Sequence, residues 1–283
     1  MPSSHQALIS AAELKGLLAQ GQAPLLIDVS FDLGETDAGE RAYRAAHLPG
    51  AHYLHLDRDL SGAKTGRNGR HPLPAPEAWA RCLSNLGVRA GQQVVAYDAQ
   101  GGMYAARLWW LLRWVGHAEV AVLDGGLQAW VAAGGAVADT VSPAANPSVF
   151  QTGPSLVAQI DADHLQAQLG RVRLIDARAP ERFRGDVEPL DAKAGHIPGA
   201  SNRLFKNNLQ ADGTFKPAAR LREEFLSLLG PFSAEQTVHQ CGSGVTACHN
   251  LLAMMHAGLP GAQLYPGSWS EWSSTPGRPL AQG

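Results

Sequence analysis

An internal duplication is the feature that most constrains how this chain can fold. Residues 26–29 (Leu-Ile-Asp-Val) are mirrored by residues 174–177 (Leu-Ile-Asp-Ala), and residues 46–51 (Ala-His-Leu-Pro-Gly-Ala) by residues 195–200 (Gly-His-Ile-Pro-Gly-Ala). Residues 125–130 and 266–272, each with glycine followed by tryptophan, form a third pair in the same order. Two similar domains in tandem are the simplest explanation.

Each half alternates short apolar runs with helical patterns, which predicts a parallel sheet with helices on both faces. In the first half, the patterns predict helices over 10–19, 76–86, 104–115 and 126–133, and strands over 25–29, 94–98 and 120–123. In the second half, the patterns predict a strand over 173–177 and a helix over 248–257. They also predict that residues 235–238 are the end of a short buried strand. The predicted fold class is therefore α/β, with two tandem domains.

Cys241 lies where the last of these strands passes into the helix. We predict that residues 241–246 form the connecting loop, in which Gly242 and Gly244 let successive N–H groups point inward. Such a loop, with a helix N-terminus behind it, favours an anion and hence the thiolate of a cysteine. Cys241 is therefore predicted to be a nucleophile, whereas Cys82 and Cys248 are predicted to be core residues.

Asp98 occupies the matching position in the first half and is no nucleophile for such chemistry. In parallel sheets, ligands bind beyond the carboxyl ends of the strands. We therefore predict a non-catalytic domain over 1–142 that lends a wall to the site, and a catalytic domain over 155–283. The linker predicted over 143–154 contains three prolines and no hydrophobic periodicity.

Composition narrows the function classes. The chain has 283 residues, 45% of them hydrophobic, and a net charge of −2, so no basic surface indicates nucleic acid. Three cysteines do not make a disulfide framework. Residues 1–10 have no signal-peptide pattern, and the apolar stretch 108–112 is far too short to span a membrane. A cytoplasmic protein that binds neither nucleic acid nor membrane is expected.

Other readings of Cys241 remain open. Cysteine-dependent phosphatases use a similar loop, but they need an arginine six positions after the cysteine, and this chain has Ala247 there. Cys241, Cys248 and His249 have neither the number nor the spacing of a structural zinc site. A non-catalytic binding module is the remaining alternative, and the nucleophile with its two glycines argues against it.

The two His-Ile/Leu-Pro-Gly-Ala segments, the Cys241 loop and the Gly-Ser-Trp-Ser-Glu-Trp stretch at 267–272 make the chain similar to the tandem-domain rhodanese sulfurtransferases. The loop 241–247 resembles that of 3-mercaptopyruvate sulfurtransferases, since thiosulfate-preferring members carry basic residues after the cysteine. The resemblance implies that Cys241 carries sulfur as a persulfide from a small-molecule donor to cyanide, a small thiol or thioredoxin. It implies no cofactor and no metal.

The resemblance also implies which arginine binds the donor. Arg182 precedes an aromatic residue, as the substrate arginine of the family does, and a guanidinium suits a planar carboxylate. Arg178 and Arg184 compete for this role. Mercaptopyruvate-type members place a second arginine after Glu-Pro, where this chain has Leu190, so Arg184 or Lys193 is the alternative source of that charge.

Proton delivery is the last implied function. In mercaptopyruvate-type members, an acid and a histidine matching Asp57 and His71 are proposed to act with the loop serine, here Ser243. Such a set would protonate the enolate that sulfur transfer leaves. We therefore expect mercaptopyruvate as the preferred donor, with a thiosulfate:cyanide sulfurtransferase as the alternative. The other residues expected to bind substrate are Gly242, Gly244, Val245 and Thr246. His47 and His196, which recur at one position of both halves, are expected to be structural.

Overall fold

The chain forms two units, each built on one parallel sheet. The structure is a computed structural model that describes residues 5–143 and 146–283. The first unit comprises the chain up to Ser61 together with Pro74–Leu156 and Leu209–Phe215, and the second comprises Gly62–Leu73, Val157–Asn208 and Lys216–Gly283. The domain and linker bounds expected along the sequence stay a prediction, and residues 1–4 and 144–145, on which they partly fall, lie outside the described residues.

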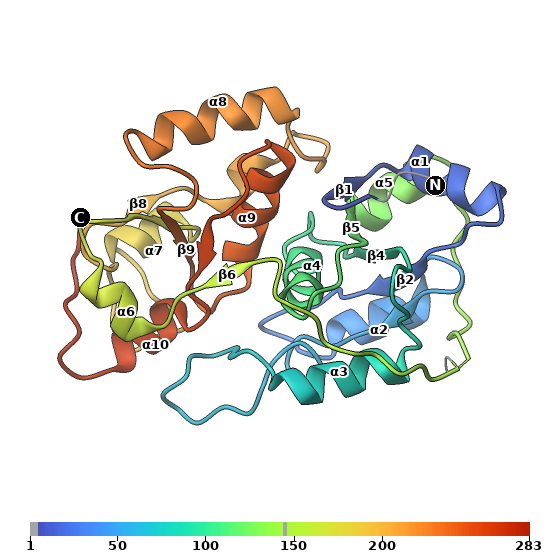
Figure 1. The fold of residues 1–283 in the computed structure, drawn as a ribbon, viewed down its shortest axis with the longest axis horizontal. Coiled ribbons are helices and arrows are strands. Elements are labelled where there is room, and N and C mark those ends of the chain that lie inside the picture. Colours follow the sequence, from blue (N-terminus) through green and yellow to red (C-terminus); the bar gives the residue numbers. More distant parts are fainter. Residues whose placement is uncertain (1–4, 144–145) are drawn as a thin grey trace. The chain divides into compact units, whose positions relative to one another are not determined.

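The first unit has a five-stranded parallel sheet in the order β1-β5-β4-β2-β3 (Figure 1). Its strands are β1 (Leu8–Ile9), β2 (Leu25–Asp28), β3 (His52–Tyr53), β4 (Val94–Tyr97) and β5 (Val120–Leu123). Its helices are α1 (Ala11–Ala19), α2 (Ala38–Ala45), α3 (Pro76–Asn85), α4 (Ala105–Trp114) and α5 (Gly126–Ala132). The sequence therefore predicts every strand and helix named here for the first unit that is longer than two residues, except α2. That helix lies in a polar stretch rich in Gly, Asp and Glu.

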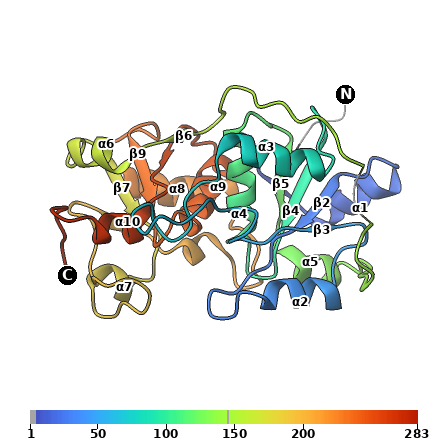
Figure 2. The same cartoon turned by 90° about the horizontal axis from the view of Figure 1, so that it is seen from below.

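Helices cover both faces of this sheet, as Figure 2 shows with α3 on one side of the strands and α2 and α5 on the other. The core on the α2 and α5 face also includes α1, and it contains Leu14, Tyr43, Val95 and Trp130. The α1 helix begins at a capping box, in which the Ser10 hydroxyl accepts the Glu13 N–H. This layered arrangement explains why the central strands are apolar on both faces.

The second unit repeats the arrangement with the strand order β6-β10-β9-β7-β8. Its strands are β6 (Ala158–Gln159), β7 (Arg173–Asp176), β8 (Ser201–Asn202), β9 (Thr237–Gln240) and β10 (Gln263–Leu264). Its helices are α6 (Ala162–Ala167), α7 (Pro180–Arg184), the 3-10 helix η1 (Phe205–Asn208), α8 (Ala218–Leu229), α9 (Thr246–His256) and α10 (Ser268–Ser274). Both sheets are parallel throughout, which confirms the predicted fold class.

The two faces of the second sheet differ in character. Helices α6 and α10 cover one face, where Trp269 of α10 lies in the same core as Leu174 and Val238 of the sheet. The opposite face carries His239, whose Nε2 lies 3.0 Å from the Met254 sulfur on α9 and whose ring stands edge-on to Phe225 on α8. Burial lowers the pKa of His239 to about 3, so this histidine is a neutral core residue.

The duplication extends to single interactions. His47 and His196 each pair through their backbones with a residue near the end of their unit, Ala138 and Ala281. The ring Nδ1 of His47 lies 2.6 Å from the Tyr43 carbonyl, and that of His196 lies 2.9 Å from the Phe183 carbonyl. Each imidazole also stacks on the aromatic ring of the same residue. Both histidines thus hold corresponding loops, which is a structural role.

Two predicted boundaries beside Cys241 were wrong. The strand runs over Thr237–Gln240 and not to Val238, so that Cys241 directly follows its last residue. The helix begins at Thr246 and not at Cys248, which shortens the connecting loop to residues 241–245. The β-branched threonine gives no helix signal in the sequence, because the loop that precedes it decides where the helix starts. Across the described residues, no helix is long and apolar enough to cross a membrane.

Candidate active site

The backbone of Cys241 is held from both sides at the carboxyl end of β9. Its N–H donates to the Ser268 hydroxyl at 3.1 Å, and its carbonyl accepts the Trp269 N–H at 3.0 Å. The side chain is almost fully buried, with α9 starting at the end of the loop. The backbone of Cys241 is therefore fixed at the end of β9, five residues before the first residue of α9.

Ser268 is a residue that the sequence analysis missed. Within the described residues it is the one non-glycine with a positive φ, 53°, and the hydroxyl that accepts from Cys241 also donates to the Tyr265 carbonyl at 2.9 Å. The first unit has Gly126 at this place, with φ 58°. A left-handed serine is strained, and such strain gathers at functional sites. The mismatch of glycine with serine between the two repeats was the available signal.

The first unit has a loop that corresponds to the Cys241 loop, and the group at its centre is a carboxylate. Asp98 directly follows β4, as Cys241 follows β9, and its carboxylate accepts four backbone N–H groups, at 2.8–2.9 Å, from Gln100, Gly102, Tyr104 and Ala105. The loop and the start of α4 therefore surround a negative charge that belongs to the chain itself. In the second unit, the sulfur of Cys241 occupies the corresponding residue position.

The two glycines of the Cys241 loop act in different ways. Gly244 has φ 75°, and an added β-carbon would lie 2.3 Å from the Pro266 carbonyl oxygen, so both its conformation and its surroundings require glycine. Gly242 has no such φ. An added β-carbon there would meet guanidinium groups instead, 3.0 Å from Arg70 Nη2 and 3.6 Å from Arg182 Nη1. Gly242 is thus not required by a left-handed backbone, and its part in the curl of the loop stays a prediction.

A histidine and a hydroxyl meet beside the nucleophile. His71 Nδ1 lies 2.7 Å from Ser243 Oγ, and both residues are buried. His71 belongs to residues 62–73, a stretch that we call the strap segment and that is part of the second unit. Asp57 lies in the first unit, where its N–H donates to His55 Nδ1, and its part in a relay stays a prediction. Val245 caps α9, and Thr246 is the first residue of that helix.

The three candidate arginines have different surroundings. Arg178 is buried, binds Asp176 at 2.6 Å and lies over the Trp269 ring, so it is a core ion pair. Arg184 pairs with Asp186 at the surface. Arg182 binds the buried Glu188 at 2.6 Å through Nη2, while its Nη1 faces Gly242. Of the three, only Arg182 is both fixed by a carboxylate and near the Cys241 loop.

Arg70 is the second residue that the sequence analysis missed. Its Nη1 binds Asp191 at 2.7 Å, and Asp191 also lies 3.5 Å from Arg182 Nη2. Lys193 is exposed, and the three atoms nearest to an added β-carbon at Gly242 belong to Arg70 and Arg182. The resemblance implies that His71 acts with Ser243, but nothing in the sequence indicates that the neighbouring Arg70 faces the Cys241 loop.

The other cysteines do not share this environment. Burial raises the pKa of Cys82 on α3 to about 12, so its thiol stays protonated. Cys248 lies inside α9, where its Sγ donates to the Gly244 carbonyl at 3.3 Å. The described residues contain no group of three or more His, Cys, Asp or Glu side chains that could hold a metal ion. The groups that the site offers are therefore a cysteine, two guanidinium groups and a hydroxyl–imidazole pair.

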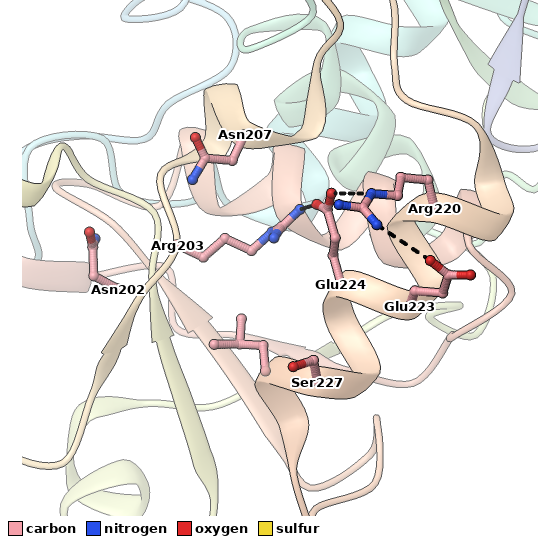
Figure 3. Close-up of a pocket in the computed structure, with 8 residues that line it drawn as sticks. Asn202, Arg203, Asn207, Arg220, Glu223, Glu224 and Ser227 are labelled. Carbon is pink, nitrogen blue, oxygen red and sulfur yellow. Dashed lines mark hydrogen bonds and ion pairs between the residues drawn. The ribbon is translucent and has the colours of Figure 1, made fainter.

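Figure 3 shows a separate hollow of about 550 Å³ in the second unit, between η1 and α8. Its cations are already bound: Arg203 Nη2 and Arg220 Nε lie 2.8 and 2.9 Å from the two carboxylate oxygens of Glu224. The Arg203 guanidinium also stacks on Phe225. Because these charges neutralise one another, the hollow is a poorer place for an anion than the Cys241 loop.

The chain thus combines a duplicated parallel sheet with a cysteine that is fixed ahead of a helix. The rhodanese-like domain matches residues 10–133 and 161–275, and the chain belongs to the rhodanese family. It is 48% identical over 284 residues, 99% of each chain, to a Pseudomonas aeruginosa protein named "Probable 3-mercaptopyruvate sulfurtransferase". It is 36% identical over 308 residues, 98% of this chain and 87% of the relative, to "Thiosulfate/3-mercaptopyruvate sulfurtransferase 2" of Arabidopsis thaliana.

A solved structure agrees with these relatives. The 3-mercaptopyruvate sulfurtransferase of Leishmania major superposes with a TM-score of 0.82 at 30% identity, over 95% of this chain and 74% of that one. These similarities confirm the tandem rhodanese fold and the enzyme class, a sulfurtransferase, that the sequence predicts.

Proposed function

We propose that this sulfurtransferase takes the sulfur of 3-mercaptopyruvate onto Cys241 as a persulfide and passes it to a thiophilic acceptor. The Cys241 thiolate attacks the donor sulfur, the carbon–sulfur bond breaks, and its electron pair leaves as the enolate of pyruvate. The acceptor then attacks the outer sulfur of the persulfide and releases the thiolate. Two covalent half-reactions of this kind predict ping-pong kinetics. Cyanide, a small thiol and thioredoxin are the proposed acceptors.

The observation that carries the choice of donor is the contact between His71 and Ser243. The enolate needs a proton, and the Ser243 hydroxyl, 2.7 Å from His71 Nδ1, can deliver one and be reprotonated through the imidazole. Sulfite, which leaves from thiosulfate, needs no such proton. Asp57 is proposed as the acid that orients His71. The N–H groups of Gly242, Gly244, Val245 and Thr246 are proposed to stabilise the persulfide anion.

Arg182 is proposed to bind the donor's carboxylate. Glu188 holds one edge of its guanidinium, and Nη1 remains on the side of Gly242. A guanidinium held in this way binds a planar carboxylate with little loss of side-chain entropy. Thiosulfate stays a second candidate donor, because the Arabidopsis relative carries both donors in its name. The enzyme is proposed to act in the cytoplasm, a reducing compartment where the thiolate persists.

The decisive experiment compares Cys241→Ser with Cys248→Ser. Mass spectrometry after incubation with mercaptopyruvate should show an adduct of about 32 Da, the mass of one sulfur, on the wild type and on Cys248→Ser. Cys241→Ser should show no adduct and no turnover with either donor. Steady-state kinetics should give a higher kcat/KM for mercaptopyruvate than for thiosulfate. Turnover by Cys241→Ser would exclude the mechanism, and a preference for thiosulfate would exclude the donor assignment.

A further inference from the structure

Two guanidinium groups converge on the one position of the Cys241 loop that has no side chain and no need of a left-handed backbone. An added β-carbon at Gly242 would lie 3.0 Å from Arg70 Nη2, and 3.6 and 3.8 Å from Nη1 and Nη2 of Arg182. A β-carbon at residue 242 would therefore crowd the Arg70 guanidinium and touch that of Arg182. Glycine at this position keeps open the region directly beside the nucleophile.

Arg70 is positioned by its own backbone and by Asp191. Its N–H donates to the Ser270 hydroxyl at 2.9 Å, while its Nη1 binds Asp191 at 2.7 Å. The side chain of Asp191 is only 8% exposed, so this ion pair is screened from water. Because two points fix the residue, the direction of the guanidinium is set in the absence of substrate.

The guanidinium of Arg70 is not fully used by the protein. Its Nε is buried and, within the part of the chain that the structure describes, has no hydrogen-bond partner. Its Nη2 is the atom that faces position 242. Buried N–H groups in folded proteins are nearly always paired, so Arg70 keeps a hydrogen-bond donor that a ligand can satisfy.

Arg182 is held in the same manner but by another carboxylate. Glu188 takes Nη2 at 2.6 Å and Nε at 3.3 Å, which leaves Nη1 on the side of Gly242. Asp191 joins the two systems, since it lies within 4 Å of both guanidinium groups. The carboxylates thus bind the outer edges of both guanidinium groups, and the edges toward the loop remain for an anion.

We propose that Arg70 is a donor-binding residue, which supplies together with Arg182 the pair of guanidinium groups that binds the donor's carboxylate. This inference rests on the proposed function. It names a residue of the strap segment, and not Arg184 or Lys193, as the source of the charge that Leu190 lacks. Asp191 is then a positioning residue, since it touches both arginines and orients them toward the loop.

Kinetics with mercaptopyruvate test this assignment. Arg70→Ala should raise KM by about ten- to a hundredfold and change kcat much less, because a contact to the carboxylate is lost while the thiolate remains. Arg70→Lys should recover part of the loss, since an ammonium keeps the charge but cannot fork. The inhibition constant of pyruvate, which carries the same carboxylate, should rise in parallel with KM.

Arg67→Ala is the matched control, because it removes the same charge from an exposed residue of the same segment and should leave KM unchanged. An unchanged KM in Arg70→Ala overturns the inference. A second outcome also overturns the inference. If kcat falls in Arg70→Ala and returns in Arg70→Lys, while the inhibition constant of pyruvate stays at the wild-type value in both variants, Arg70 only anchors the segment. Failure of the proposed function would look different, because the wild type would then form no sulfur adduct.

Discussion

Strands β2 and β7 each end in an aspartate, and a single neighbouring residue decides the charge environment of that aspartate. Asp176 is paired with Arg178 at 2.6 Å, whereas Asp28 lies at the corresponding place with Ser30 two residues later. Burial without a cation raises the pKa of Asp28 to about 6. The neutral form of the Asp28 carboxyl group is therefore more favoured in the folded protein than in the unfolded chain.

This shift predicts a pH-dependent stability. The folded-state pKa lies above the unfolded value, so the free energy of unfolding should fall as the pH rises from about 4 through 6. Asp28→Asn, which keeps the oxygen that accepts the Ser30 N–H, should remove about 2 kcal/mol of that loss between pH 4 and 7.5. Urea unfolding at both pH values measures it.

Asp37→Asn, an exposed change of the same charge in the same unit, is the control and should leave the pH profile unaltered. A profile for Asp28→Asn that matches the wild type would show that Asp28 is ionised at low cost.

The pair of His71 and Ser243 leads to a second prediction for single residues. His71→Ala and Ser243→Ala should each slow the mercaptopyruvate reaction by about ten- to a thousandfold, the usual effect of one acid–base group. Turnover of thiosulfate should change much less, because sulfite leaves without a proton. Parallel assays with both donors provide the measurement. Equal losses with both donors would mean that the pair only shapes the site.

At the scale of elements, the loop between β9 and α9 depends on Gly244. Gly244→Ala places a β-carbon 2.3 Å from the Pro266 carbonyl oxygen, so the loop has to move. A shift of about 1 Å at the nucleophile is expected to lower kcat about a hundredfold. The turnover rate and the melting temperature should both fall.

Gly199→Ala separates the two causes of such a loss. Gly199 has φ 81°, similar to Gly244, but nothing lies within 4 Å of its added β-carbon. The variant Gly199→Ala therefore has the backbone strain of about 1–2 kcal/mol without the steric clash. Gly199→Ala should lose some stability and keep its kcat. A loss of kcat equal to that of Gly244→Ala would mean that global destabilisation is the cause.

At the scale of the whole molecule, the strap segment connects two parts of the first unit in sequence and yet belongs to the second unit. It brings Arg70 and His71 to a loop that is about 170 residues away along the chain. Such long-range contacts have a high cost in chain entropy, so they need specific contacts to persist. Close packing of Gly69 against the Gly267 backbone is one of these.

Gly69→Ala tests the seating of this segment. An added β-carbon would lie 2.8 Å from the Gly267 carbonyl oxygen, whereas one at Gly66, which has nearly the same φ, meets nothing within 4 Å. Gly69→Ala should lower kcat/KM for mercaptopyruvate at least about tenfold, because it displaces two residues of the site. Gly66→Ala should retain the wild-type value. Similar activity in the two variants would show that the segment tolerates displacement.

Local patterns in the sequence were enough to predict the architecture. Hydrophobic runs and the repeat of residues 26–29 in 174–177 predict two parallel sheets, since a short apolar strand followed by a helix has few ways to bury its surface. The position of Cys241 between a strand and a helix follows from the same local signals. Ser243 and Arg182 could be selected because they lie next to recognisable motifs.

What the tertiary structure decided is how distant residues meet. Arg70 carries no local signal, since a polar residue in a loop reads as a surface residue until its partners are known. The mismatch of glycine with serine at Ser268 gains a meaning only when the contact with Cys241 is known. Their roles depend on Asp191, Gly242 and Cys241, which lie far along the chain or in another loop. Contacts of this kind arise from packing of the whole chain, so sequence periodicity determined the sheets and only the folded structure determined the environment of Cys241.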